Sequence, residues 1–235
     1  MSEKVVQLGG LTAIGVGDEC AELAIVVLHG RQMEAADLAP FAHSLAAHAR
    51  RAPAAESAAY WVFPDAPLVA EPRGRTWWPV DSEARIRRLA AGPMELSAMD
   101  PPGRHEARAL LGGLVGALAR RYVLVGFSQG GMLAMDHVLH DGTRPEALAL
   151  LSSTRIAIAD WQPRVDRLAD LPVLVAHGHA DRELSFEAGE LLRDFALAGG
   201  ARVTWLPFDG AHEIPLVVWR ALRGLIRQCS HVTSP

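Results

Sequence analysis

The stretch Tyr122-Val123-Leu124-Val125-Gly126-Phe127-Ser128-Gln129-Gly130-Gly131 decides how the chain folds. In it an apolar, β-type run ends at a G-x-S-x-G pattern, and a helical pattern follows from Gln129 to His140. A serine on such a sharp strand-to-helix turn has strained backbone angles, and its neighbours two positions away must be small so that strand and helix can approach. The sequence therefore predicts that Ser128 is an exposed nucleophile at a helix N-terminus, and a plain glycine-rich turn is the weaker interpretation.

Short apolar runs alternate with helical patterns along the rest of the chain. The predicted strands cover residues 24–28, 59–63, 122–127, 147–151, 173–176 and 203–206. The predicted helices cover residues 37–51, 103–120, 129–140, 187–198 and 214–228, with a short one around 161–169. The strand runs are continuously apolar, which is typical of strands covered on both faces. This pattern predicts an α/β fold with a mostly parallel central sheet and helices on both faces.

Local signals refine this prediction. Asp37 is expected to cap the first helix, and Gly199-Gly200 to end the fourth. Residues 1–23 are expected to add edge strands around turns at Gly9-Gly10 and Gly15–Gly17. The proline-rich segment 64–102 is expected to be the least regular part, a functional or mobile loop. Because no repeat or composition break is visible, residues 1–235 are expected to form a single domain without a lid domain.

The composition is that of an ordinary globular protein, with 235 residues, 50% of them hydrophobic, and a formal net charge of −4. The slight acidity argues against nucleic acid as a partner. Cys20 and Cys229 lie far apart, which indicates neither a disulfide framework nor a zinc site. No secretory signal or apolar run of membrane-spanning length is visible, so a cytoplasmic protein without a membrane span is expected.

A serine hydroxyl needs a base to take its proton, and a histidine held by a carboxylate is the usual arrangement. His137 and His140 belong to the helix after Ser128 and are expected to point away from its tip. His177 ends a strand and has a packing or turn-stabilising interpretation. His212 is best placed, because it follows a predicted strand and precedes the last helix.

The acid should come from the loop after the previous strand, where Asp181 lies. Asp209 is too close to His212 in sequence, and Asp160 is a weaker alternative. The order of nucleophile, acid and histidine is the one found in α/β-hydrolases. It predicts a triad of Ser128, Asp181 and His212.

An oxyanion needs hydrogen-bond donors, and two backbone amides are expected to supply them. The Gln129 N–H is free at the start of its helix. The loop after residues 24–28 contains His29-Gly30-Arg31-Gln32, in which the Arg31 N–H is the expected second donor. A metal at His177, His179 and Asp181 is disfavoured, because no further histidine or cysteine has the spacing to complete the site. No metal or cofactor is therefore expected.

Four motifs appear together: Leu28-His29-Gly30, the GFSQGG block at 126–131, His177-Gly178 with Asp181, and Gly210-Ala211-His212-Glu213-Ile214-Pro215. From Ala24 to Gln228 the chain resembles the phospholipase/carboxylesterase family of α/β-hydrolases, which includes acyl-protein thioesterases. The resemblance implies the same triad and oxyanion donors. Many members continue the first motif with Leu-Gly-Asp or Arg-Gly, whereas this chain has Arg31-Gln32-Met33, so the acyl pocket and the place of the Arg31 side chain stay open.

The segment Arg75-Thr76-Trp77-Trp78-Pro79 looks like an aromatic stretch that borders the substrate cleft in a bacterial branch of these esterases. Trp77 and Trp78 are therefore candidate substrate-binding residues, with core packing an equal alternative. They could also face a second copy of the chain in a homodimer.

The leading functional prediction is a serine carboxylesterase that acts on small or medium-chain esters through an acyl-enzyme. The alternatives are an acyl-protein or acyl-CoA thioesterase or lysophospholipase and, less favoured, a binding protein that has the fold but no activity. The expected substrate is a small-molecule ester or thioester.

Overall fold

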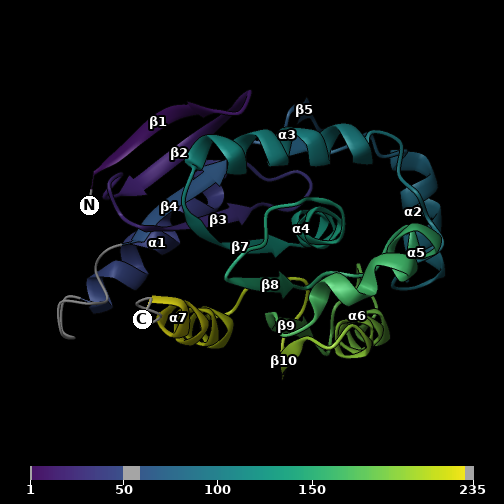
Figure 1. The fold of residues 1–235 in the computed structure, drawn as a ribbon. Helices are drawn as coiled ribbons and strands as arrows, with labels where there is room; N and C mark the ends of the chain where they lie inside the picture. Colours follow the sequence, from purple (N-terminus) through teal and green to yellow (C-terminus); the bar gives the residue numbers. More distant parts are fainter. Residues whose placement is uncertain (1, 50–58, 231–235) are drawn as a thin grey trace.

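A twisted eight-stranded sheet forms the centre of the computed structural model, which describes residues 2–49 and 59–230 (Figure 1). The strand order is β1-β2-β4-β3-β7-β8-β9-β10. The first two pairs, β1 with β2 and β2 with β4, are antiparallel, and all other neighbours are parallel. The predicted α/β-hydrolase architecture is confirmed. The strands of the large sheet are β1 (Glu3–Leu8), β2 (Leu11–Gly17), β3 (Leu23–Leu28), β4 (Ala59–Pro64), β7 (Arg121–Phe127), β8 (Ala147–Leu151), β9 (Pro172–Gly178) and β10 (Arg202–Phe208).

Helices cover both faces of this sheet (Figure 1). α1 (Ala35–Ala49) and α7 (Leu216–Ser230) pack against one face, where Phe41 stacks on Trp219 with ring centroids 4.3 Å apart. The helices α3 (Arg104–Leu118), α4 (Gln129–His140) and α6 (Phe186–Ala198) cover the other face. α5 (Ile158–Trp161) continues into the 3₁₀ helix η2 (Gln162–Leu168) where the sequence predicts one short helix.

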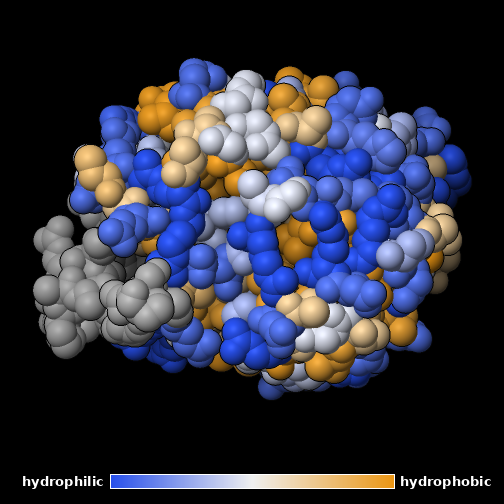
Figure 2. All heavy atoms as spheres, viewed as in Figure 1, coloured by the Kyte–Doolittle hydropathy of each residue, from blue (hydrophilic) through white to orange (hydrophobic). Residues whose placement is uncertain are grey.

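The burial of the strands explains the pattern of the sequence. Every residue of β3 and β8 is buried, because each of these strands has helices above and below it. β10 lies at the edge of the sheet and has only partial cover. Seen from the same side as in Figure 1, the molecular surface is largely hydrophilic, with hydrophobic residues in separate patches (Figure 2).

Some local predictions are corrected. α1 begins at Ala35, whose N–H donates to Asp65 Oδ1 at 2.8 Å, so the predicted cap Asp37 lies inside the first turn. Its end near Arg51 lies outside the described residues. The turn at Gly9-Gly10 is confirmed, but Gly15 and Gly17 lie within β2, where a Cβ on Gly15 would meet the Tyr60 hydroxyl at 2.1 Å. α6 ends before Gly199 as predicted.

Segment 64–102 is more ordered than expected. It contains a small hairpin of β5 (Leu68–Val69) and β6 (Arg75–Thr76), followed by α2 (Ser82–Ala91). Asp81 caps α2 by accepting from the Ala84 N–H at 2.9 Å. No residue of α2 is buried, and the helix is short and rich in charged residues, so it lies outside the core and differs from the more apolar helices that the sequence predicts. No separate lid domain stands over the sheet within the described residues, and the single-domain organisation of the whole chain stays a prediction.

Candidate active site

Ser128 lies on the sharp turn between β7 and α4, with φ 53° and ψ −117°. Its N–H donates to Leu151 O at 2.9 Å, and its carbonyl accepts from Ser153 Oγ at 2.9 Å. A Cβ on Gly126 would approach Gly130 O to 2.3 Å, and one on Gly130 would approach Leu28 O to 2.4 Å. Because both clashes are with backbone, the turn requires these glycines.

His212 and Asp181 come together with Ser128 at the carboxyl ends of the parallel strands. His212, which follows β10, places Nε2 2.8 Å from Ser128 Oγ. Its Nδ1 lies 2.7 Å from Oδ2 of Asp181, which follows β9. If Nδ1 carries the proton and donates to the carboxylate, Nε2 is free to accept the Ser128 hydroxyl proton.

The Asp181 carboxylate is buried and fully hydrogen-bonded. Oδ1 accepts from the Glu183 and Leu184 N–H groups at 2.8 and 3.0 Å. Burial alone would raise the pKa of Asp181. The hydrogen bonds from His177 and His212, the His212 charge and the Leu184 N–H outweigh burial and hold this pKa well below its usual range. Asp181 is therefore ionised at neutral pH.

His177 contacts the same carboxylate, which the sequence interpretation missed. Its Nε2 lies 3.3 Å from Asp181 Oδ2 and 3.1 Å from Leu184 O, and its side chain is fully buried. A Cβ on Gly189 would approach His177 Nδ1 to 2.5 Å, so the ring fills the space that this glycine leaves. The predicted packing role of His177 thus includes a second contact to the acid.

The loop after β3 lies against the nucleophile. A Cβ on Gly30 would meet Phe127 Cδ1 at 2.9 Å and Ser128 Cβ at 3.3 Å, so the loop approaches this closely only with glycine there. Within the described ranges, neither the Arg31 N–H nor the Gln129 N–H donates a hydrogen bond. Both amides are thus available as donors to a ligand.

Backbone bonds to β6 hold this loop in place. The Gln32 N–H donates to Arg75 O at 2.8 Å, and the Arg75 N–H donates to Met33 O at 3.0 Å. Gln32 has φ 66°, in the left-handed region that favours glycine. The chain thus makes a left-handed turn here with Gln32 in place of a glycine.

The two candidate tryptophans have different positions. Trp78 lines the cavity beside Ser128. Trp77 does not line that cavity, which favours the core-packing alternative for this residue. Its ring is buried, its indole N–H donates to His29 O at 2.9 Å, and its backbone N–H donates to Gln129 Oε1 at 3.0 Å. Trp77 therefore connects the loop after β3 to the side chain of Gln129, the residue after the nucleophile.

A cavity of about 430 Å³ opens beside Ser128. This volume is in the range of small-molecule sites. Its walls come from the nucleophile turn, from α2 and from residues 94–102. The apolar part of the lining consists of Trp78, Pro79, Val80, Ala84, Met94, Leu96, Met99, Pro101, Pro102, Met132, Ile156 and Leu184. The charged part consists of Arg31, Asp81, Arg85, Arg88, Asp100 and Glu183.

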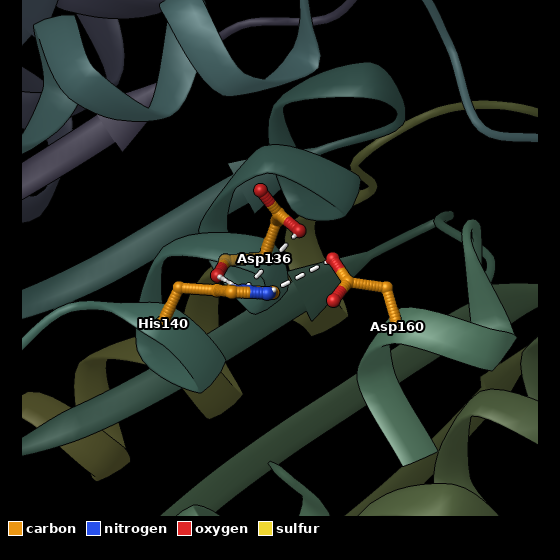
Figure 3. A group of neighbouring side chains, drawn as sticks. All are labelled: Asp136, His140 and Asp160. Carbon is orange, nitrogen blue, oxygen red and sulfur yellow. Dashed lines mark hydrogen bonds and ion pairs between the residues drawn. The ribbon is translucent and has the colours of Figure 1, made fainter. Parts of the chain in front are cut away.

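The alternative acid, Asp160, lies in another cluster, with Asp136 and His140 (Figure 3). His140 Nε2 lies 3.0 Å from Asp160 Oδ2. Although the three side chains are close enough to share a cation, Arg104 forms ion pairs with both carboxylates. Arg108 lies 3.0 Å from Asp136. Because the carboxylate charges are already balanced, the cluster is best described as a buried ion-pair network joining α3, α4 and α5.

With this geometry established, comparison with known proteins identifies the family. The model of a family described as Phospholipase/Carboxylesterase matches residues 108–230, about half of the chain. The chain belongs to the phospholipase/carboxylesterase family. Acyl-protein thioesterase 1 of Neurospora crassa is 29% identical over 98 residues, which cover 40% of this chain and 40% of that protein. The match therefore spans less than half the length of this curated relative.

Solved structures share the fold of this family member. Esterase PE8 has a TM-score of 0.73 at 22% identity, covering 93% of this chain and 99% of that one. Acyl-protein thioesterase 2 of Zea mays has a TM-score of 0.70 at 17% identity, covering 97% and 99% of the two chains. At these identities the likeness shows the fold alone. None of the described helices has the length and apolar character needed to cross a bilayer. The homodimer and the cytoplasmic location stay predictions.

Proposed function

We propose that this chain is a serine carboxylesterase that hydrolyses small or medium-chain esters, with Ser128 as nucleophile, His212 as base and Asp181 as acid. The observation that carries the proposal is the continuous contact from Ser128 Oγ to His212 Nε2 at 2.8 Å and from His212 Nδ1 to Asp181 Oδ2 at 2.7 Å. Membership of the phospholipase/carboxylesterase family supports it.

In the proposed reaction, Ser128 Oγ attacks the acyl carbonyl carbon while its proton passes to His212 Nε2. The developing oxyanion accepts hydrogen bonds from the Arg31 and Gln129 N–H groups. Asp181 stabilises the imidazolium, which then protonates the departing alkoxide. Water, activated by the neutral His212, attacks the acyl-enzyme and releases the acid together with free Ser128.

The cavity supports an acyl group of modest length, since its walls are largely apolar and its volume is about 430 Å³. A series of p-nitrophenyl esters from acetate to dodecanoate tests this. We expect kcat/KM to pass through a maximum at short or medium length, and Ser128→Ala to abolish turnover. Equal turnover by wild type and Ser128→Ala would contradict the proposal. Binding of the esters by wild type without any turnover would also contradict it.

A thioesterase is the second candidate, favoured by the similarity to acyl-protein thioesterase 1 of Neurospora crassa. The triad does not distinguish oxygen from sulfur as the leaving atom. Matched octanoyl oxygen esters and thioesters decide between the two candidates. A kcat/KM at least tenfold higher on the thioester, through Ser128, would favour the thioesterase.

A further inference from the structure

The side chain of Arg31 has no role in the proposed mechanism. Its backbone N–H belongs to the proposed oxyanion site, and the residue lines the cavity that also contains Ser128. It lines an adjoining hollow as well, formed by residues 68–71 and the start of α2. Nη2 contacts Glu71 and Ser82 of this hollow, so the guanidinium group lies where the hollow adjoins the proposed acyl pocket.

This guanidinium has no carboxylate partner among residues 2–49 and 59–230. Its two hydrogen bonds both come from Nη2, to Glu71 O at 3.4 Å and to Ser82 Oγ at 3.3 Å. These are long contacts to neutral acceptors. A guanidinium group has five N–H donors, so most of them remain available.

The carboxylates of the cavity are engaged elsewhere. Glu183 pairs with Arg85, and Asp100 lies 2.8 Å from the buried Arg104. Asp81 caps α2 through the Ala84 N–H. The cavity thus combines apolar walls with a guanidinium that forms no direct ion pair with the acids of the lining.

Burial and the nearby Arg85 charge lower the pKa of Arg31 from its ordinary value, while Glu183 opposes them. An arginine nevertheless stays charged at neutral pH. A second arginine of the cavity, Arg88, has no ion pair within the described residues, but it is exposed and contributes less. An anionic ligand in the cavity would relieve the unfavourable proximity of Arg31 to Arg85.

We propose that the preferred substrates are monoesters of short dicarboxylic acids, whose free carboxylate pairs with the Arg31 guanidinium. This inference rests on the proposed function. The reaction is the same: the Ser128 Oγ–acyl bond forms, the ester C–O bond breaks, and the proton passes through His212 to the alcohol. Water then releases the dicarboxylic acid, which ionises to a dianion and frees one proton. A planar guanidinium suits a carboxylate because it can donate two parallel hydrogen bonds to it.

Monomethyl adipate and methyl hexanoate test the proposal, because their acyl chains have equal length and only one carries a charge. Proton release in a pH-stat at pH 7.5 gives kcat/KM for both. We expect wild type to favour the adipate at least tenfold, and this preference to weaken as salt screens the charge pair. Arg31→Met, which keeps the backbone N–H, should lower kcat/KM for the adipate at least tenfold more than for the hexanoate, mainly through KM.

Arg87→Met is the matched control. Arg87 lies on α2, does not line the cavity and pairs with the exposed Glu83 at 3.6 Å, so the preference should be unchanged. Carboxymethyl hexanoate, with its charge on the alcohol part, should gain no advantage over methyl hexanoate. Any of three results would overturn the inference: wild type shows no preference for the adipate, Arg31→Met loses the same activity on both esters, or only carboxymethyl hexanoate is preferred. The proposed function itself fails only if no ester is hydrolysed in a Ser128-dependent manner.

Discussion

Replacing Asp181 by asparagine removes a charge and leaves the shape of the side chain. Asparagine keeps one oxygen, which the Glu183 and Leu184 N–H groups hold at the Oδ1 position. Its NH₂ group then faces His212 Nδ1, where the carboxylate oxygen lies at 2.7 Å in the native protein. Nδ1 must become an acceptor, which puts the proton on Nε2. His212 then has no lone pair for the Ser128 proton.

The expected loss in kcat is about 10⁴-fold at neutral pH, the size seen when a triad histidine is held in the wrong tautomer. That is about 5.4 kcal/mol of transition-state stabilisation. KM should change little, because Asp181 does not line the cavity. Steady-state kinetics on p-nitrophenyl butyrate measure both constants. Asp209→Asn is the control, since this exposed residue has no proposed role and kcat should stay within twofold. A loss below tenfold in Asp181→Asn would refute the assignment of the acid.

The same variant should reveal a pH-dependent contribution to stability. The Asp181 carboxylate is in contact with His212 Nδ1 at 2.7 Å and with the fully buried His177 Nε2 at 3.3 Å, so the substitution should lower the free energy of unfolding by about 1.5–3 kcal/mol at pH 7. Because the pKa of Asp181 is depressed in the folded state, this stabilisation is complete above the unfolded value of about 3.9 and is lost as pH falls toward the folded value. Urea unfolding at several pH values should show the difference between wild type and variant shrinking below about pH 4. A constant difference would contradict this reasoning.

Two further predictions concern packing. Gly130→Ala should lower the free energy of unfolding by more than about 3 kcal/mol or prevent folding, because the new Cβ would lie 2.4 Å from Leu28 O. Gly116→Ala in α3, where nothing lies within 4 Å of the new Cβ, should raise the free energy of unfolding by about 0.5–1 kcal/mol. Similar melting temperatures for the two variants would argue against the tight turn. Asp136→Asn should cost about 3–5 kcal/mol by leaving the buried Arg104 without its full pairing, while the folded fraction keeps its kcat. Urea unfolding combined with activity per folded molecule checks this, and unchanged stability would show that the network is dispensable.

The sequence predicted the sheet and the proximity of Ser128, Asp181 and His212, because continuous apolar strands and glycine turns leave few arrangements of the chain. It failed for α2, a short helix rich in charged residues that lies wholly outside the core. It also left Trp77 and Trp78 undecided, since both are buried and only contacts between distant segments separate the one lining the cavity from the one supporting the backbone. The contact of His177 with Asp181 depends on side-chain orientation, which sequence spacing does not specify.

Covalent labelling with a fluorophosphonate probe tests the central claim most directly. The probe reacts with an activated serine hydroxyl, and mass spectrometry of the digested protein locates the adduct. We predict a single adduct on Ser128, absent in Ser128→Ala and strongly slowed in His212→Ala. An unlabelled wild-type protein, or labelling that persists in folded Ser128→Ala, would contradict the claim that Ser128 is the nucleophile.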